Sequence, residues 1–170
     1  MKKILALVTS LTAISAVCAG VLAYVNEITK EPIKATAAAN EQKAIMAVMP
    51  RGVEKAEPVG DAFVGRNAEG KVIGYAAKGM DAGGYGGDIV LMVGFQADKK
   101  SVISYKVLQA AETPGLGMKL STPEFAGQFA GKNGASLGVK KDGGEIEAIT
   151  SATITSRAVC RAIADAQRKL

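Results

Sequence analysis

The chain has 170 residues, a formal net charge of +5 from 21 basic and 16 acidic residues, and only 5% aromatic residues. It contains no histidine, which excludes Ser-His-Asp and Cys-His catalysis, histidine-ligated metals and haem with an axial histidine. The basic residues are scattered rather than interleaved with aromatic ones, so a solvated surface explains the charge and no nucleic-acid partner is indicated.

The N-terminal segment starts with two lysines and continues over Ile4–Val25 without a charge. As a helix this run is about 33 Å long, enough to cross a hydrocarbon core of about 30 Å. Residues 1–25 are therefore predicted to form a cytoplasmic tip and a single transmembrane helix. The positive-inside rule then places the rest of the chain outside the cytoplasm. The alternatives are a cleaved signal peptide and, less favoured, a lipoprotein site at Cys18.

Residues 26–50 predict a membrane-proximal helix, because alanine and other good helix formers dominate this stretch. Its first charged residues are expected near the lipid surface. Pro32 is expected near a helix start or at a kink, and Pro50-Arg51-Gly52 should end the helix.

Residues 51–170 predict an α+β domain with a mostly antiparallel sheet flanked by helices. Ala62–Arg66 and Lys71–Lys78 are expected to form a hairpin. Asp88–Phe95 is apolar on both faces and is therefore predicted as a central strand, with Ser101–Leu108 as its partner.

The second half of this domain predicts a short helix, a polar loop and a strand. Ser121–Glu124 combines a capping residue, a proline and an acid, which is typical of a helix start. Gly131–Gly144 reads as a loop with one short edge strand at Ser136–Lys140. Gly144–Thr150 is predicted as a strand, and Cys160 as a small buried residue of the last helix.

Hydroxyl side chains cluster where the last helix should begin, at Thr150, Ser151, Thr153, Thr155 and Ser156. The unpaired N–H groups and the dipole of a helix start favour a phosphate. Arg157, one turn further, is placed to pair with such a charge. The alternative is a helix capped by these hydroxyls that binds no ligand.

The run Thr150-Ser151-Ala152-Thr153, followed by Thr155, resembles the flavinylation motif of FMN-binding domains. The resemblance implies that the phosphate of FMN is esterified to the hydroxyl of Thr153. The chain departs from the motif at Ser151, where the family usually has glycine. If that position needs a positive φ, serine is strained there.

Two further loops extend the resemblance: Gly84-Tyr85-Gly86-Gly87, and Glu112 to Gly117 with Lys119. Together with the anchor they are similar to the G subunits of Rnf-type ferredoxin:NAD oxidoreductase complexes. Leu116 is expected to pack on the flavin ring and Lys119 to stabilise its reduced form. Besides Thr153, the residues expected to bind the cofactor are Thr150, Ser151, Ala152, Ile154, Thr155, Gly84, Tyr85, Gly86, Glu112, Thr113, Gly115, Leu116, Gly117 and Lys119. No residue is expected to be catalytic or to bind a metal.

The resemblance implies an electron carrier that relays electrons in ferredoxin:NAD oxidoreduction coupled to Na⁺ or H⁺ transport. It implies membrane subunits with flavin and iron–sulfur centres as partners, and a flavin transferase that loads the FMN. The chain alone is not expected to turn over. The alternatives are the C subunit of the sodium-translocating NADH:quinone reductase, and a membrane-anchored binding or assembly module without a redox group.

Overall fold

The computed structural model describes residues 2–170 and contains two compact units. The first unit ends at Ala39, and the second spans Asn40–Leu170. The predicted domain boundaries after residues 25 and 50 remain a prediction.

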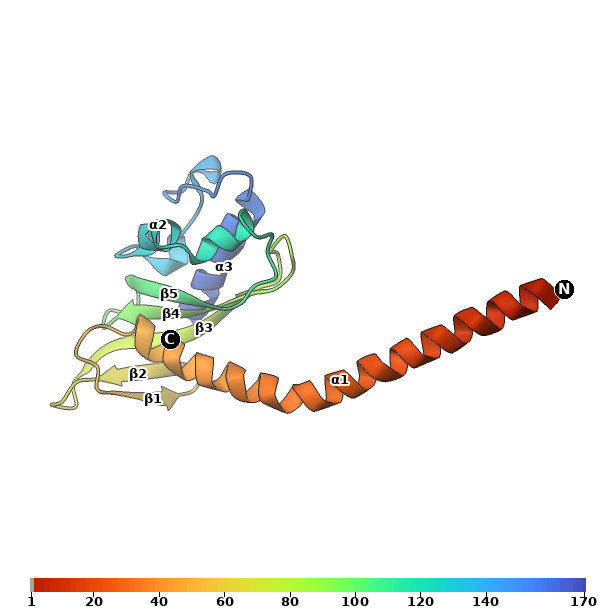
Figure 1. The fold of residues 1–170 in the computed structure, drawn as a ribbon. Coiled ribbons are helices and arrows are strands. Elements are labelled where there is room, and N and C mark those ends of the chain that lie inside the picture. The colour runs from red at the N-terminus through yellow and green to blue at the C-terminus, as the bar shows by residue number, and fades with distance from the viewer. Residues whose placement is uncertain (1) are drawn as a thin grey trace. The chain divides into compact units, whose positions relative to one another are not determined.

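Helix α1 runs without interruption from Lys2 to Val48 (Figure 1). It is long and apolar enough to cross a membrane, with a mean hydropathy of 2.2 over its most apolar window and none of that window buried. A signal sequence near an N-terminus has the same properties. Apolar side chains such as Leu7 and Leu22 are exposed.

No helix starts at Pro32, because α1 continues through it. Proline lacks the N–H that would bond one turn back, so α1 continues there with one backbone hydrogen bond fewer. Thr36 Oγ1 donates a hydrogen bond to the Pro32 carbonyl at 2.8 Å. The helix ends at Val48, and a turn over Arg51 and Gly52 follows, so the predicted stop is confirmed.

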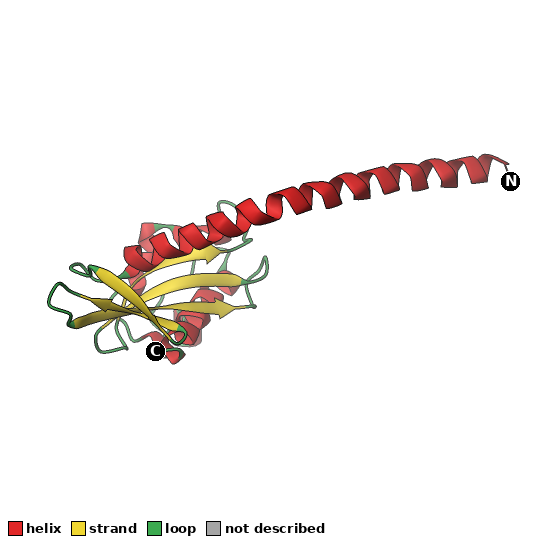
Figure 2. Cartoon of the chain, turned by 90° about the horizontal axis from the view of Figure 1, so that it is seen from below, coloured by secondary structure: helices red, strands yellow, loops and turns green. Residues whose placement is uncertain are grey.

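The second unit is built on a five-stranded antiparallel sheet in the order β1-β2-β3-β4-β5. Figure 2 shows its strands in yellow, with helices beside them. The strands are β1 (Lys55–Val59), β2 (Ala62–Arg66), β3 (Val72–Asp81), β4 (Ile89–Gln96) and β5 (Val102–Gln109). The predicted hairpin, the central position of β4 and its pairing with β5 are confirmed. Strand β1 was not predicted, because an exposed edge strand that contains Pro58 shows no apolar alternation.

Helices cover both faces of this sheet, which confirms the predicted α+β class. The last turns of α1 pack on one face, where the backbone of Val48 lies against Gly94 of β4. Helix α3 (Thr153–Arg168) packs on the other face, where Ala162 lies against Gly79 of β3. A Cβ added at either glycine would lie 1.9 Å from a helix carbonyl oxygen. Each helix therefore approaches the sheet where a strand has no side chain.

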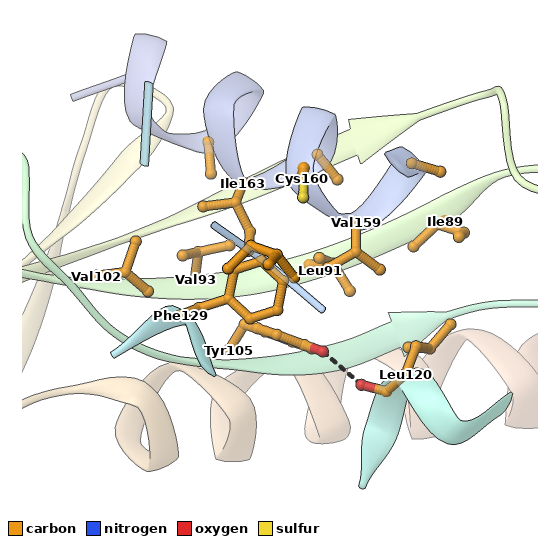
Figure 3. Packing of buried hydrophobic residues seen from close by; sticks show 14 of the residues in the cluster. Ile89, Leu91, Val93, Val102, Tyr105, Leu120, Phe129, Val159, Cys160 and Ile163 are labelled. Carbon is orange, nitrogen blue, oxygen red and sulfur yellow. Dashed lines mark hydrogen bonds between the residues drawn. The ribbon is translucent and has the colours of Figure 1, made fainter. Parts of the chain in front are cut away.

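The main core lies between α3 and the sheet (Figure 3). Tyr105 and Phe129 meet edge to face with ring centroids 5.5 Å apart, and the Tyr105 hydroxyl donates to the Leu120 carbonyl. Cys160 is buried in the same core, and this burial raises the pKa of its thiol to about 11. The prediction that Cys160 is a structural rather than a reactive cysteine is therefore supported.

The segment between β5 and α3 consists of short helices and loops. Helix α2 (Pro123–Ala126) begins at the predicted proline. The other short elements are the 3₁₀ helices η1 (Gly117–Ser121), η2 (Gly127–Phe129), η3 (Gly134–Ser136) and η4 (Lys140–Asp142).

The strands predicted at Ser136–Lys140 and Gly144–Thr150 are wrong, since only one isolated bridge joins Val139 to Ile146. Ile146 and Ile149 both reach the core. Because they are three residues apart, an extended strand would point them to opposite faces.

Candidate functional site

Three segments enclose a depression of about 550 Å³ at the start of α3. One is the loop that joins β3 to β4, the second follows β5, and the third is the first turn of α3 with the residues before it (Figure 1). This volume is typical of small-molecule sites, which span about 300–1,000 Å³. We call the depression the α3 pocket; its lining is Tyr85, Glu112, Thr113, Leu116, Gly117, Ser151, Ala152, Thr153, Ile154 and Thr155.

The N-terminus of α3 has no side-chain cap, so the alternative of a hydroxyl-capped helix is wrong. The N-cap residue is Ala152, whose methyl group cannot accept a hydrogen bond. The first N–H groups of a helix have no acceptor within that helix. They remain available to an anion, which the positive end of the helix dipole also attracts.

A closed set of hydrogen bonds fixes the turn before α3. Ser156 Oγ accepts from the Ile149 N–H at 2.9 Å and donates to the Ala152 carbonyl at 3.0 Å. The Ala152 N–H donates to the Ile149 carbonyl at 2.9 Å. Within this turn Ser151 has a φ of 62°, so the strain expected from a serine in place of glycine is present. Sequence reasoning did not place Ser156 in the site, although a helical serine often bonds back to the preceding turn.

Thr153 is the first residue of α3 and lines the pocket while half-buried. Its neighbours Thr155 and Ser156 are fully buried, and the protein bonds both of their hydroxyls. Within the described chain no protein group bonds the Thr153 hydroxyl. Of the three, Thr153 is thus the one placed to meet a molecule in the pocket.

Glu112 is buried beneath the pocket with 6% of its surface exposed. Its Oε1 accepts a hydrogen bond from the Gly86 N–H at 3.1 Å, and its Oε2 accepts one from Thr155 Oγ1 at 2.7 Å. We call these two hydrogen bonds the Glu112 bridge. It links the three segments that enclose the pocket.

All ten residues that line the α3 pocket belong to the predicted site. Gly84 and Gly86, the two predicted glycines of the β3–β4 loop, lie outside the lining, against the Glu112 carboxylate. Lys119, which was predicted to stabilise the reduced flavin, is exposed on η1. The predicted residues outside the lining are Gly84, Gly86, Thr150, Gly115 and Lys119.

The rim of the pocket is apolar and exposed. Tyr85, Leu116 and Ile154 are 72%, 42% and 49% exposed, respectively. No basic side chain is among the lining residues, and Glu112 is the one charged residue there. An anion at the start of α3 would therefore be bound mainly by backbone N–H groups.

Arg157, which was expected to pair with a ligand charge, forms an ion pair with Asp142. Its Nε and Nη2 donate to the two carboxylate oxygens of Asp142, each at 2.6 Å. Hydrogen bonding to Arg157 lowers the pKa of Asp142. The pair joins α3 to η4.

A second ion pair, which the sequence did not predict, joins α3 to the end of β3. Arg161 donates from Nε and Nη2 to Asp81, each at 2.8 Å, and the Gly83 N–H donates to the same carboxylate at 2.9 Å. The hydrogen bond from Arg161 is the main cause that lowers the pKa of Asp81. The pair holds the start of the glycine-rich loop against α3.

The FMN-binding domain family matches residues 84–168, which run from the glycine-rich loop to the end of α3. The chain therefore carries an FMN-binding domain. It is 31% identical to the G subunit of the ion-translocating oxidoreductase complex of Methanosarcina acetivorans, over 95% of this chain and 92% of that protein. It is 34% identical to the G subunit of the proton-translocating ferredoxin:NAD(+) oxidoreductase complex of Clostridium ljungdahlii, over 96% of this chain and 89% of that protein.

The chain belongs to the G subunits of ion-translocating oxidoreductase complexes, which confirms the resemblance found in its three loops. A crystal structure of the C subunit of the Na⁺-translocating NADH-quinone reductase from Parabacteroides distasonis is similar, with a TM-score of 0.51 and 26% identity over 62% of this chain and 57% of that chain. NqrC of Shewanella oneidensis shares the fold with a TM-score of 0.52, at 21% identity over 66% of this chain and 64% of that chain. Both likenesses cover less than two thirds of the crystallised chain.

Proposed function

We propose that this chain is the electron-carrier subunit of an Rnf-type membrane complex and holds FMN covalently on Thr153. The phosphate of FMN is esterified to the threonine hydroxyl. The domain lies outside the cytoplasm and relays electrons in ferredoxin:NAD oxidoreduction coupled to Na⁺ or H⁺ transport.

The observation that carries this proposal is the position of Thr153. Thr153 lines the α3 pocket at a helix start that no side chain caps, and no protein group of the described chain bonds its hydroxyl. A phosphate on this oxygen lies beside the free N–H groups of the first turn, which bind phosphate well. The covalent bond supports retention of the cofactor where no cytoplasmic pool can replace it.

The other lining residues fit a flavin. Leu116 and Tyr85 offer apolar surface to the ring, and Ala152 and Gly117 leave the backbone accessible. Both carboxylate oxygens of Glu112 accept hydrogen bonds, one from the Gly86 N–H and one from Thr155 Oγ1. The carboxylate therefore does not bond the N–H groups of the first turn of α3, which a phosphate needs. When bound, FMN supplies electron transfer, and the protein supplies its orientation and environment.

The apolar part of α1 supports a single-pass location in the cytoplasmic membrane, with the N-terminus in the cytoplasm and lipid around the helix. The names of the relatives support other subunits of the same complex as partners. The resemblance to Rnf-type complexes implies that these are membrane subunits with flavin and iron–sulfur centres. The resemblance to FMN-binding domains implies a flavin transferase as the partner for maturation, which moves FMN from FAD onto Thr153.

The test is to express the chain with its N-terminal segment, together with a flavin transferase, and to export it. The expected result is a flavin-fluorescent band that survives denaturation, with an FMN adduct on the peptide that contains Thr153 in intact-mass and peptide analysis. Thr153→Ala should abolish the band. Thr122→Ala is the control, because Thr122 makes no capping bond and lies outside the pocket.

A colourless wild-type protein, or an adduct that persists in Thr153→Ala, would contradict the proposal. The first of these results would favour a membrane-anchored binding module without a redox group. Protease accessibility of the C-terminal domain from the periplasmic side of spheroplasts tests its location. Protection there would contradict the proposed orientation.

A further inference from the structure

We propose that Glu112 is a positioning residue for the attachment of FMN to Thr153, acting through the Glu112 bridge. This inference rests on the proposed function. The Glu112 carboxylate fastens the three segments around the α3 pocket to one another, so that the Thr153 hydroxyl faces a pocket of fixed width before any cofactor arrives.

Burial of the Glu112 side chain is energetically unfavourable by itself. Among residues 2–170 it is the one charged side chain in the buried class, and no ion pair of the described chain involves it. A buried carboxylate destabilises a protein unless hydrogen bonds replace its lost hydration. Apolar side chains of similar size would often stabilise such a position as well or better. The carboxylate therefore serves a particular geometry rather than stability alone.

The groups that the carboxylate joins all belong to the surroundings of Thr153. Gly86 belongs to the same loop as Tyr85 on the rim. Thr155 belongs to the first turn of α3, two residues after Thr153. Glu112 itself begins the segment that carries Leu116. One side chain thus connects the attachment residue to both surfaces that would hold the ring.

Glycines pack closely around the Glu112 bridge. A Cβ added at Gly117 would lie 2.4 Å from Glu112 Oε2 and 3.0 Å from Thr155 Oγ1. A Cβ at Gly84 would lie 2.8 Å from Glu112 Oε1, and one at Gly86 would lie 1.9 Å from the Ala111 carbonyl oxygen. The backbone therefore approaches the bridge so closely that only glycine fits beside it.

The fixed geometry matters because attachment requires the Thr153 oxygen to reach, in line, the phosphorus of the FMN half of FAD. The new O–P bond replaces the P–O bond to AMP, which leaves, and the hydroxyl proton passes to a base supplied by the flavin transferase. Misplacement of a reacting group by about 1 Å can slow a reaction by about a hundredfold. Glu112 touches neither the phosphate nor the ring. Its effect reaches Thr153 through Thr155 and the shared helical turn.

The test uses the full chain in detergent, with purified flavin transferase, FAD and Mg²⁺. Thr155→Val keeps the side-chain shape but removes the hydroxyl that donates to Glu112. The expected result is a fall of about tenfold in the rate of attachment at saturating acceptor concentration. Thr155→Ser should restore most of that rate, because it returns the donor. Thr122→Val, a change of the same size outside the pocket, should react like the wild type.

A second readout does not depend on attachment. In the flavin-free chain, hydrogen exchange should speed up in peptides that cover Gly86 and Leu116 in Thr155→Val, while exchange in β4 stays at the wild-type level. If Thr155→Val fails to fold, Glu112→Asp serves instead. The shorter side chain keeps the charge but cannot reach both donors, and the same losses are expected.

Wild-type attachment and wild-type exchange in Thr155→Val or Glu112→Asp would overturn the inference, and so would a failure of Thr155→Ser to restore the rate. These outcomes are separate from failure of the proposed function. If the wild-type chain itself takes no FMN at Thr153, the proposed function fails. If the wild type is loaded and the bridge variants are loaded as fast, only the role of Glu112 fails.

Discussion

Replacing Ser151 with glycine should stabilise the protein, because the native φ at this position is 62°. An L-residue in this left-handed region is destabilised by about 1–2 kcal/mol, since Cβ approaches the following carbonyl oxygen. Glycine avoids that contact, but its greater freedom in the unfolded chain offsets about 0.5–1 kcal/mol of the gain. The net effect is an increase of about 0.5–1 kcal/mol in the free energy of unfolding. No protein group of the described chain bonds the Ser151 hydroxyl, so its removal costs little.

Urea unfolding of the detergent-solubilised chain measures this effect, with tyrosine fluorescence as the probe because the chain has no tryptophan. With a slope near about 2 kcal/mol per molar urea, the midpoint should rise by about 0.3–0.5 M.

Ser151→Ala is the matched control, because alanine keeps the strain and removes only the hydroxyl, so its midpoint should stay near that of the wild type. Ala152→Gly, at a negative φ of −134°, should lower the midpoint. A midpoint that falls in Ser151→Gly, or that rises equally in Ser151→Ala, would refute the strain argument.

Three further predictions concern stability. Asp81→Asn removes the partner of Arg161. Because the folded pKa of Asp81 is lowered, the contribution is present above the unfolded pKa of about 4 and is lost as pH falls through the folded pKa. The difference in unfolding free energy between wild type and variant should therefore shrink as pH falls below about 4. Gly86→Ala places a methyl group 1.9 Å from a carbonyl oxygen and should destabilise by about 3 kcal/mol in urea unfolding, whereas Gly127→Ala, with open space around it, should not. Tyr105→Phe leaves a buried carbonyl without its donor and should lower the unfolding free energy by about 1–2 kcal/mol; an unchanged urea midpoint would argue against that bond.

The features that the sequence predicted are those that depend on neighbouring residues. The uncharged run of α1, the apolar run of β4 and the helical spacing after Thr153 are each a pattern within one element. The same holds for Ser151, whose strained backbone followed from one departure within a four-residue motif. The ten lining residues of the α3 pocket were also in the predicted site, because three short motifs carried them.

The predicted secondary structure was wrong where buried residues do not recur at the regular spacing of a helix or a strand. The chain from Gly131 to Thr150 was expected to hold two strands, but Ile146 and Ile149 anchor it at a spacing that no strand provides. Strand β1 was not predicted, because an edge strand buries few side chains and therefore needs no apolar pattern.

The sequence by itself determined where most of the helices and strands lie and that a cluster of hydroxyl residues stands where α3 begins. Only the tertiary structure decided the partners of the polar groups. Arg157 pairs with Asp142, and Glu112 accepts a hydrogen bond from Thr155, 43 residues away. The physical reason is that periodicity encodes how much of a side chain is buried, whereas a hydrogen bond also needs a donor and an acceptor within about 3 Å. That distance is set by how distant segments pack, and no local pattern records it.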